Sequence, residues 1–181
     1  MGRDKAQILV RDQPLWQRQL DVLRETGAEE VFISGPLDSP YAQSGLRIVP
    51  DLVESAGPLA GLAASLAACA HDWLLVLAVD MPHMEPRVLR ALLATAAQSG
   101  TGAVPVDATG RLEPLAAVYP KSAHPYAEEC LRTGKLQLSA YVEMLERAGL
   151  VHRTPIREPH CFANWNTPAD LAGDDRGSGR S

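Results

Sequence analysis

The sequence lacks the apolar segments that would place it in a membrane or in the secretory route. Its longest apolar run, residues 73–79, has the length of a strand and falls far short of the ~20 residues that a membrane helix needs. The N-terminal residues 1–5, MGRDK, carry charge but precede no apolar stretch, so we expect no secretory leader. These absences predict a protein that works away from membranes.

Cysteines and clustered basic residues are also scarce. The three cysteines, Cys69, Cys130 and Cys161, lie far apart and form no C-x-x-C pair, which argues against a disulfide framework and against a cysteine-based zinc site. Twenty-two acidic residues outnumber 17 lysines and arginines, giving a net charge of −5 with no basic stripe. We therefore expect no nucleic-acid partner, and the cytoplasm is the predicted location.

Several catalytic signatures are missing from the chain. It contains no G-x-S-x-G elbow, no G-x-x-x-x-G-K-[ST] loop and no G-x-G-x-x-G fingerprint. Its five histidines show no H-x-x-x-H spacing and are interpreted as surface or loop residues. A hydrolase triad, a P-loop nucleotide site and a dinucleotide-binding loop are therefore all without support.

What is present is an alternation of apolar strands and amphipathic helices. The periodicity predicts helices over 14–26, 58–70, 86–99, 123–132 and 136–148, and strands over 31–33, 47–50, 74–79, 103–106, 115–119 and 151–156. This alternation is typical of a doubly wound α/β fold with a mostly parallel sheet. The continuous apolar run 74–79 is typical of a strand in the middle of such a sheet. Residues 1–172 form the expected domain, and 173–181 the expected disordered tail.

Candidate site residues follow the predicted strands, where open parallel sheets bind their ligands. Asp80 ends the most apolar strand, and its carboxylate is either a Mg²⁺ ligand or a turn and helix-cap acid. Ser34 and Asp51 follow two other strands. Gly57 and Gly61 open a helix, where they either admit a phosphate to its N-terminus or belong to a plain loop.

Polar residues near both ends of the chain complete the candidates. Arg3 and Lys5 offer two cations that either clamp a triphosphate or belong to a solvated tail. Asn164 and Asn166 precede Thr167–Pro168, a pair that predicts the capped start of a helix. A buried amide needs hydrogen-bond partners, so the two asparagines are candidate ligand contacts.

Taken in order, these motifs resemble those of the molybdenum cofactor guanylyltransferases. The resemblance covers residues 1 to about 172, and its motifs are MGRDK (1–5), QPL (13–15), Asp51, GPLAG (57–61), VDMP (79–82), EPL (113–115) and FANWNTP (162–168). It implies a three-layer, Rossmann-like nucleotidyltransferase fold with a mostly parallel central sheet. It also implies transfer of GMP from GTP to the molybdopterin cofactor, with Mg²⁺ and release of pyrophosphate, and transient contact with cofactor insertion and acceptor proteins.

The resemblance also implies roles for the candidate residues. Lys5 matches a catalytic lysine that contacts the nucleotide phosphates, and Asp80 matches the catalytic Mg²⁺ ligand. Six residues match or adjoin the nucleotide-binding part: Gly2, Arg3, Lys5, Ser34, Asp51 and Asp80. Four residues match the substrate side: Gly57, Gly61, Asn164 and Asn166. The asparagine pair favours the guanylyl branch, because the related cytidylyl branch tends to carry Asp there.

The chain departs from the family pattern in two places. The family places a strand and a loop resembling L-A-G-G-x-S-x-R before M-G-x-x-K, whereas this sequence starts at Met1 of that segment. Either further residues precede Met1 in the native protein, or this chain is poorly active. Ser34 stands where the family usually has Asn. The alternatives are cytidylyl or other nucleotidyl transfer to a small phosphate acceptor, and a non-catalytic cofactor-binding scaffold.

Overall fold

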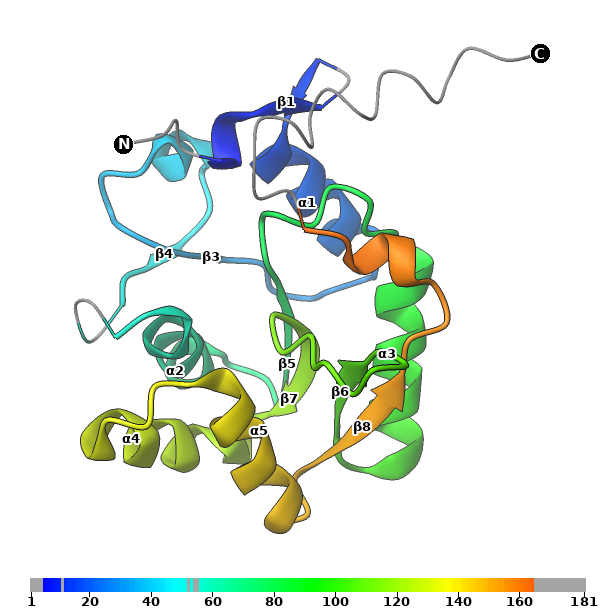
Figure 1. The fold of residues 1–181 in the computed structure, drawn as a ribbon. Coiled ribbons are helices and arrows are strands. Elements are labelled where there is room, and N and C mark those ends of the chain that lie inside the picture. Colours follow the sequence, from blue (N-terminus) through cyan, green and yellow to red (C-terminus); the bar gives the residue numbers. More distant parts are fainter. Residues whose placement is uncertain (1–4, 11, 52, 54–55, 165–181) are drawn as a thin grey trace.

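A computed structural model describes residues 5–10, 12–51, 53 and 56–164 (Figure 1). The α-helices are α1 (Leu15–Arg24), α2 (Pro58–Ala68), α3 (Pro86–Ser99), α4 (His124–Thr133) and α5 (Leu138–Arg147). The central strands are β5 (Trp73–Leu77), β6 (Gly102–Val106), β7 (Ala116–Pro120) and β8 (Val151–Pro155). The predicted helices and strands are confirmed to within a few residues. Among the described residues, no helix combines the length and the apolar character needed to span a bilayer.

The central sheet has the strand order β5-β7-β6-β8. Strand β7 runs antiparallel to both of its neighbours, whereas β6 and β8 are parallel. Consequently β5, β6 and β8 all point in one direction and only β7 is reversed. This arrangement confirms the expected mixed α/β fold with a mostly parallel central sheet.

The position of β5 corrects one expectation. In the described part of the chain β5 pairs with β7 alone and lies at the edge of the sheet, so the prediction of a central, parallel-paired strand is wrong. Its side chains are nevertheless apolar on both faces, because Leu74 and Val76 pack toward one core cluster and Leu75 and Leu77 toward the other. A run of apolar residues therefore indicates that both faces of a strand are covered, but it does not indicate whether both edges of the strand are paired.

Helices cover both faces of the sheet (Figure 1). On one face α2, α4 and α5 pack against Val104 of β6 and Tyr119 of β7. On the other face α3 packs against Ala103 and Val118, the alternate residues of the same two strands. The period of two along β6 and β7 thus divides the core into two layers around one sheet.

Four short strands lie outside this sheet. Strands β3 (Ile33–Ser34) and β4 (Ile48–Val49) form a parallel pair beside α2, and β1 (Leu9–Val10) and β2 (Gln13–Pro14) form an antiparallel hairpin before α1. The hairpin was not predicted because two-residue strands are too short to show a periodicity. Pro14 is the N-cap of α1 rather than its expected first helical residue. The helix expected after Thr167 and the tail 173–181 lie outside the described residues.

Candidate functional site

Four of the predicted site residues line one cavity of about 400 Å³. Ser34 comes from β3, Asp51 from the segment after β4, and Gly57 and Gly61 from the start of α2. The cavity reaches Val79, the residue before Asp80, at the end of β5. The structure therefore brings together residues that follow three different strands, as the sheet-edge argument predicts.

Gly61 lies at a close approach. A Cβ atom at this position would lie 2.7 Å from Ser34 Oγ, so that something would have to shift, and 3.1 Å from Asp51 Oδ1, which is a tight contact. The hydroxyl and the carboxylate therefore lie directly against the first turn of α2. Gly57, by contrast, has a φ of 67° at the N-cap of α2, a backbone conformation that favours glycine. The two glycines thus serve different physical needs.

The start of α2 is suited to an anionic ligand. The first N–H groups of a helix lack intrahelical acceptors, and the helix dipole favours negative charge near them. Pro58 occupies the first turn and has no N–H, Ala60 N–H donates to the Gly57 carbonyl oxygen at 3.0 Å, and the turn itself holds no acidic residue. Beside this turn the cavity presents one hydroxyl, from Ser34, and one carboxylate, from Asp51. A ligand carrying phosphate at one end and hydrogen-bond donors at the other matches this arrangement.

Helix α1 fixes the loop that carries Asp80. Gln19 Nε2 donates to the carbonyl oxygens of Met81 at 2.6 Å and Val79 at 3.5 Å. Arg18 Nε donates to the carbonyl oxygen of Pro82 at 2.7 Å. Asp80 itself is half-buried, and its carboxylate forms no hydrogen bond or ion pair within the part of the chain that the structure describes. The main chain of the loop is held while the carboxylate stays available.

Glu113 lies in the electrostatic field of Asp80 and was given no role from the sequence. Glu113 is only 7% exposed, and this burial is the main cause of the raised pKa of its carboxyl. The negative charges of Asp107 and Asp80 raise this pKa further, whereas Arg111, 3.2 Å away, lowers it. The motif EPL contained Glu113, but only the fold shows that it is near Asp80.

The donor set around Asp80 fits Mg²⁺. A free, half-buried carboxylate with a second carboxyl in its field offers the hard oxygen ligands and the negative charge that this ion prefers. A cation there would also relieve the repulsion between Asp80 and Glu113. The residues present are therefore compatible with the divalent ion that the resemblance implies.

The remaining predicted residues divide into two groups. Asn164 follows η4 (Pro159–Phe162), which packs in one cluster with Met81 and Met84 of the Asp80 loop. Its Oδ1 atom is buried and has no hydrogen-bond partner among the described residues. Lys5 begins η1 (Lys5–Gln7) and precedes Ala6, which lines the cavity. Gly2, Arg3 and Asn166 lie outside the described residues.

A second cavity, of about 490 Å³, runs along β5. All five residues of β5 line it, together with Thr26 to Phe32 on the opposite side. Phe32, Ser34 and Val76 line both cavities, so the two are neighbours. The edge of β5 that has no strand partner among the described residues therefore borders a groove beside Ser34.

Comparison with known proteins identifies the family. The model of the MobA-like NTP transferase domain matches residues 1–148. A probable molybdenum cofactor guanylyltransferase from Opitutus terrae is 42% identical over 175 residues, which are 94% of this chain and 86% of that protein. One from Pelotomaculum thermopropionicum is 36% identical over 176 residues, or 94% of this chain and 83% of that protein.

Solved structures agree with this result. Molybdopterin-guanine dinucleotide biosynthesis protein A from Archaeoglobus fulgidus has a TM-score of 0.79 and 25% identity, covering 97% of this chain and 90% of that one. A 2-C-methyl-D-erythritol 4-phosphate cytidylyltransferase from Thermus thermophilus shares the fold, with a TM-score of 0.73, 21% identity, and coverage of 95% and 92%. The chain belongs to the MobA-like NTP transferase family and has its nucleotidyltransferase fold.

Proposed function

We propose that this chain transfers GMP from GTP to the phosphate of the molybdopterin cofactor and releases pyrophosphate. The observation that carries the proposal is the cavity in which Ser34, Asp51 and Gly61 meet, and which ends one residue before Asp80. The relatives that are 42% and 36% identical bear the name molybdenum cofactor guanylyltransferase, which supports this choice of substrates.

The nucleotide would bind along the cavity. The positive end of the α2 dipole attracts phosphate, and the absence of a side chain at Gly61 lets Ser34 and Asp51 lie against the helix beside the ligand. Asp51 accepts hydrogen bonds from guanine N–H groups or ribose hydroxyls, and Ser34 can both donate and accept. In this assignment Gly57 shapes the entrance, since it forms the N-cap of α2.

In the reaction a phosphate oxygen of the pterin attacks the α-phosphorus of GTP. The new P–O bond forms as the bond between the α- and β-phosphates breaks, and pyrophosphate leaves with the bonding electron pair. The chain would contribute alignment and charge neutralisation rather than a covalent intermediate. Lys5, with Arg3 and Gly2 just before it in the sequence, is assigned to the charge of the leaving pyrophosphate.

Asp80 is assigned to Mg²⁺, and the Glu113 carboxyl adds negative charge beside it. When bound, the ion supplies neutralisation of charge on the phosphate oxygens. Gln19 and Arg18 keep the Asp80 loop in place during turnover, because they hold its carbonyl groups. Asn164 and Asn166 are assigned to the pterin side, and the unpartnered Oδ1 atom of Asn164 supports this assignment.

The proposal extends to partners and location. The product would pass to cofactor insertion and acceptor proteins through transient contacts, in the cytoplasm. The three cysteines of the chain are free thiols in the structure, which agrees with a reducing compartment. Crosslinking in cell extract with the purified chain as bait tests for these contacts, and capture of no cofactor-handling protein contradicts them.

The decisive test combines nucleotide titration with turnover. We expect calorimetry to detect GTP binding in the presence of Mg²⁺ and much weaker binding of CTP. A preference for CTP would assign the chain to cytidylyl transfer. Cofactor binding without release of pyrophosphate would assign it to a non-catalytic scaffold.

Asp80→Asn tests the metal assignment within the same assay. The variant keeps the shape of the side chain, and its turnover should fall by at least about 100-fold because charge neutralisation at the phosphates is lost. Asp72→Asn, at the exposed start of β5, is the matched control and should leave turnover unchanged. Turnover of Asp80→Asn equal to that of the native chain would remove Asp80 from the mechanism.

A further inference from the structure

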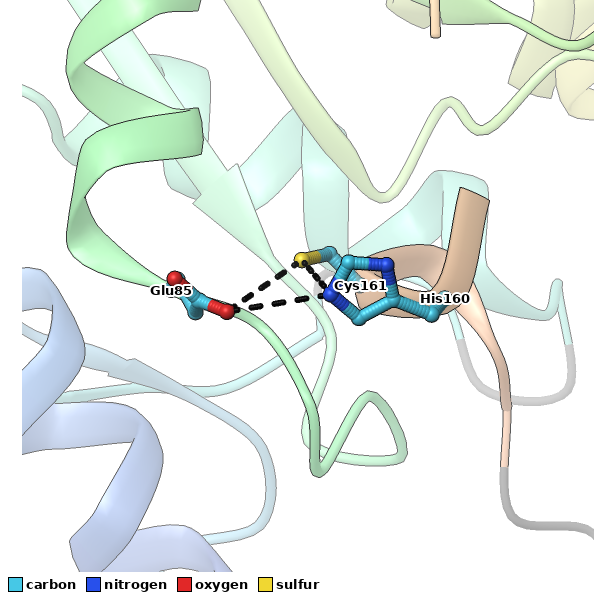
Figure 2. A group of neighbouring side chains, drawn as sticks. All are labelled: Glu85, His160 and Cys161. Carbon is cyan, nitrogen blue, oxygen red and sulfur yellow. Dashed lines mark hydrogen bonds and ion pairs between the residues drawn. The ribbon is translucent and has the colours of Figure 1, made fainter. Parts of the chain in front are cut away.

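Three side chains of metal-binding type face one another outside the cavity (Figure 2). Glu85 is the N-cap of α3, and His160 and Cys161 lie in η4. Neither the absence of C-x-x-C pairs nor the spacing of the histidines could show this group, because Glu85 lies 76 residues before Cys161 in the chain. None of the three lines the cavity that holds Ser34 and Asp51.

One atom from each side chain points into a common space. The Cys161 Sγ atom lies 3.4 Å from His160 Nε2 and 4.0 Å from Glu85 Oε1. His160 Nε2 lies 3.7 Å from the same Glu85 oxygen. The three atoms therefore form a nearly equilateral triangle of one sulfur, one nitrogen and one oxygen, as the dashed lines of Figure 2 show.

These separations match those of a tetrahedral Zn²⁺ centre. With bonds of about 2.3 Å to sulfur and about 2.0–2.2 Å to nitrogen and oxygen, tetrahedral ligand atoms lie about 3.3–3.6 Å apart. The observed edges of 3.4, 3.7 and 4.0 Å differ from these values by less than about half an ångström.

The surroundings of Glu85 orient it for such a role. Its other oxygen, Oε2, accepts a hydrogen bond of 2.6 Å from Arg87 Nε, and Arg87 Nη1 also bonds Glu158 Oε1 at 2.7 Å. Ligating carboxylates are commonly held by an outer hydrogen bond of this kind. With a thiolate at Cys161, the two glutamates and Arg87 sum to a charge of −2, which a divalent cation neutralises.

The three proposed ligands differ in their exposure to solvent. Cys161 is fully buried, whereas the His160 side chain is 63% exposed, so the group is open to solvent on the histidine side. Three protein ligands with one open position accept water as the fourth ligand. Mixed sulfur, nitrogen and oxygen donors favour Zn²⁺ over Mg²⁺, which prefers oxygen ligands alone.

We infer that Glu85, His160 and Cys161 form a Zn²⁺ site that fastens η4 to the start of α3. On binding, the Cys161 thiol releases its proton to solvent, and the His160 imidazole and the Glu85 carboxylate each contribute a lone pair. The site holds the segment that leads directly to Asn164. None of its three residues lines the nucleotide cavity or takes part in the proposed reaction.

Co²⁺ titration of the purified full chain tests this site, because thiolate coordination to Co²⁺ gives an intense near-ultraviolet charge-transfer band. We expect the band to saturate at one equivalent of Co²⁺, and Zn²⁺ to abolish it by displacement. Cys161→Ser should remove the band. His160→Gln changes a side chain that is 63% exposed, and should weaken Co²⁺ affinity by at least about 10-fold.

Two matched variants serve as controls. Cys130→Ser replaces a buried cysteine in the other core cluster, and Asp80→Asn alters the proposed Mg²⁺ site; both should keep the band and the affinity. In addition, Zn²⁺ should raise the melting temperature of the native chain but not that of His160→Gln. The inference is overturned if the native chain gives no charge-transfer band, or if Cys161→Ser or His160→Gln binds Co²⁺ as the native chain does.

Discussion

At the scale of single residues, Gly61 has the most sharply defined surroundings. Gly61→Ala would add a methyl group 2.7 Å from Ser34 Oγ and force this hydroxyl and Asp51 out of position. Alanine favours the helical conformation over glycine by about 1 kcal/mol, and this gain offsets part of the stability lost to the close contact. We expect GTP affinity to fall on the order of 10-fold, equivalent to about 1.4 kcal/mol, in calorimetric titration.

The double variant Gly61→Ala with Ser34→Ala separates steric from chemical effects. Removing Ser34 Oγ clears the shorter of the two close contacts, so part of the lost affinity should return and the two substitutions should not be additive. Strictly additive losses would mean that Gly61 and Ser34 act independently, contrary to the geometry.

Glu113 makes the stability of the folded chain depend on pH. Burial raises the pKa of its carboxyl above the ordinary value of 4.5, so ionisation costs more in the folded chain than in the unfolded one. The native chain therefore loses stability from this group as pH rises from 4.5 through the raised pKa, since the folded state binds more protons there. Glu113→Gln cannot ionise and avoids this loss.

The measurement is the free energy of unfolding in urea for both chains at several pH values. The free energy of unfolding of Glu113→Gln should increase relative to that of the native chain as pH rises above 4.5, and this difference should then become constant. A difference that stays constant over this range would contradict the raised pKa.

At the scale of elements, helix α1 acts on the site through main-chain carbonyl groups. Gln19→Leu would leave the Met81 carbonyl oxygen without the 2.6 Å bond in a place where Gln19 is only 5% exposed. We expect a loss of about 1–2 kcal/mol in the free energy of unfolding, together with slower turnover as the Asp80 loop loosens. Gln17→Leu, on the exposed face of α1, should change stability by less than about 0.5 kcal/mol.

Local elements could be predicted from the sequence because their causes are local. The start of α2 at Pro58 and the bounds of α3 follow from proline, glycine and the periodicity of apolar residues. The sheet-edge argument likewise anticipated the meeting of Ser34, Asp51 and Gly61, because all three follow strands or open a helix.

Strand pairing and contacts between distant residues could not be predicted from the sequence. The reversed direction of β7 and the edge position of β5 depend on which strands pair, and a five-residue apolar run does not encode its neighbours. The proximity of Glu113 to Asp80, and of Glu85 to Cys161, depends on the same pairing and packing. Residue type therefore identified candidate site residues but not the residues that lie beside them in the fold.

At the scale of the whole molecule, one sheet couples two core layers. Leu145 of α5 lies in one layer and Leu89 of α3 in the other, and both are fully buried. Leu145→Ala and Leu89→Ala should each cost about 2–5 kcal/mol. Because β6 and β7 contribute side chains to both layers, calorimetric unfolding of each variant should remain a single transition. Two separate transitions would show that the layers melt independently.

The edge position of β5 also has a consequence for handling the protein. Its sequence, WLLVL, contains no proline and no charge, the devices by which natural sheets discourage contact between the edges of different molecules. Within the described residues this edge is covered, because no residue of β5 is exposed and Thr26 to Phe32 line the other side of the same groove. Another copy can pair with β5 only when this segment moves away, so conditions that loosen it, such as heat, should promote ordered association between copies.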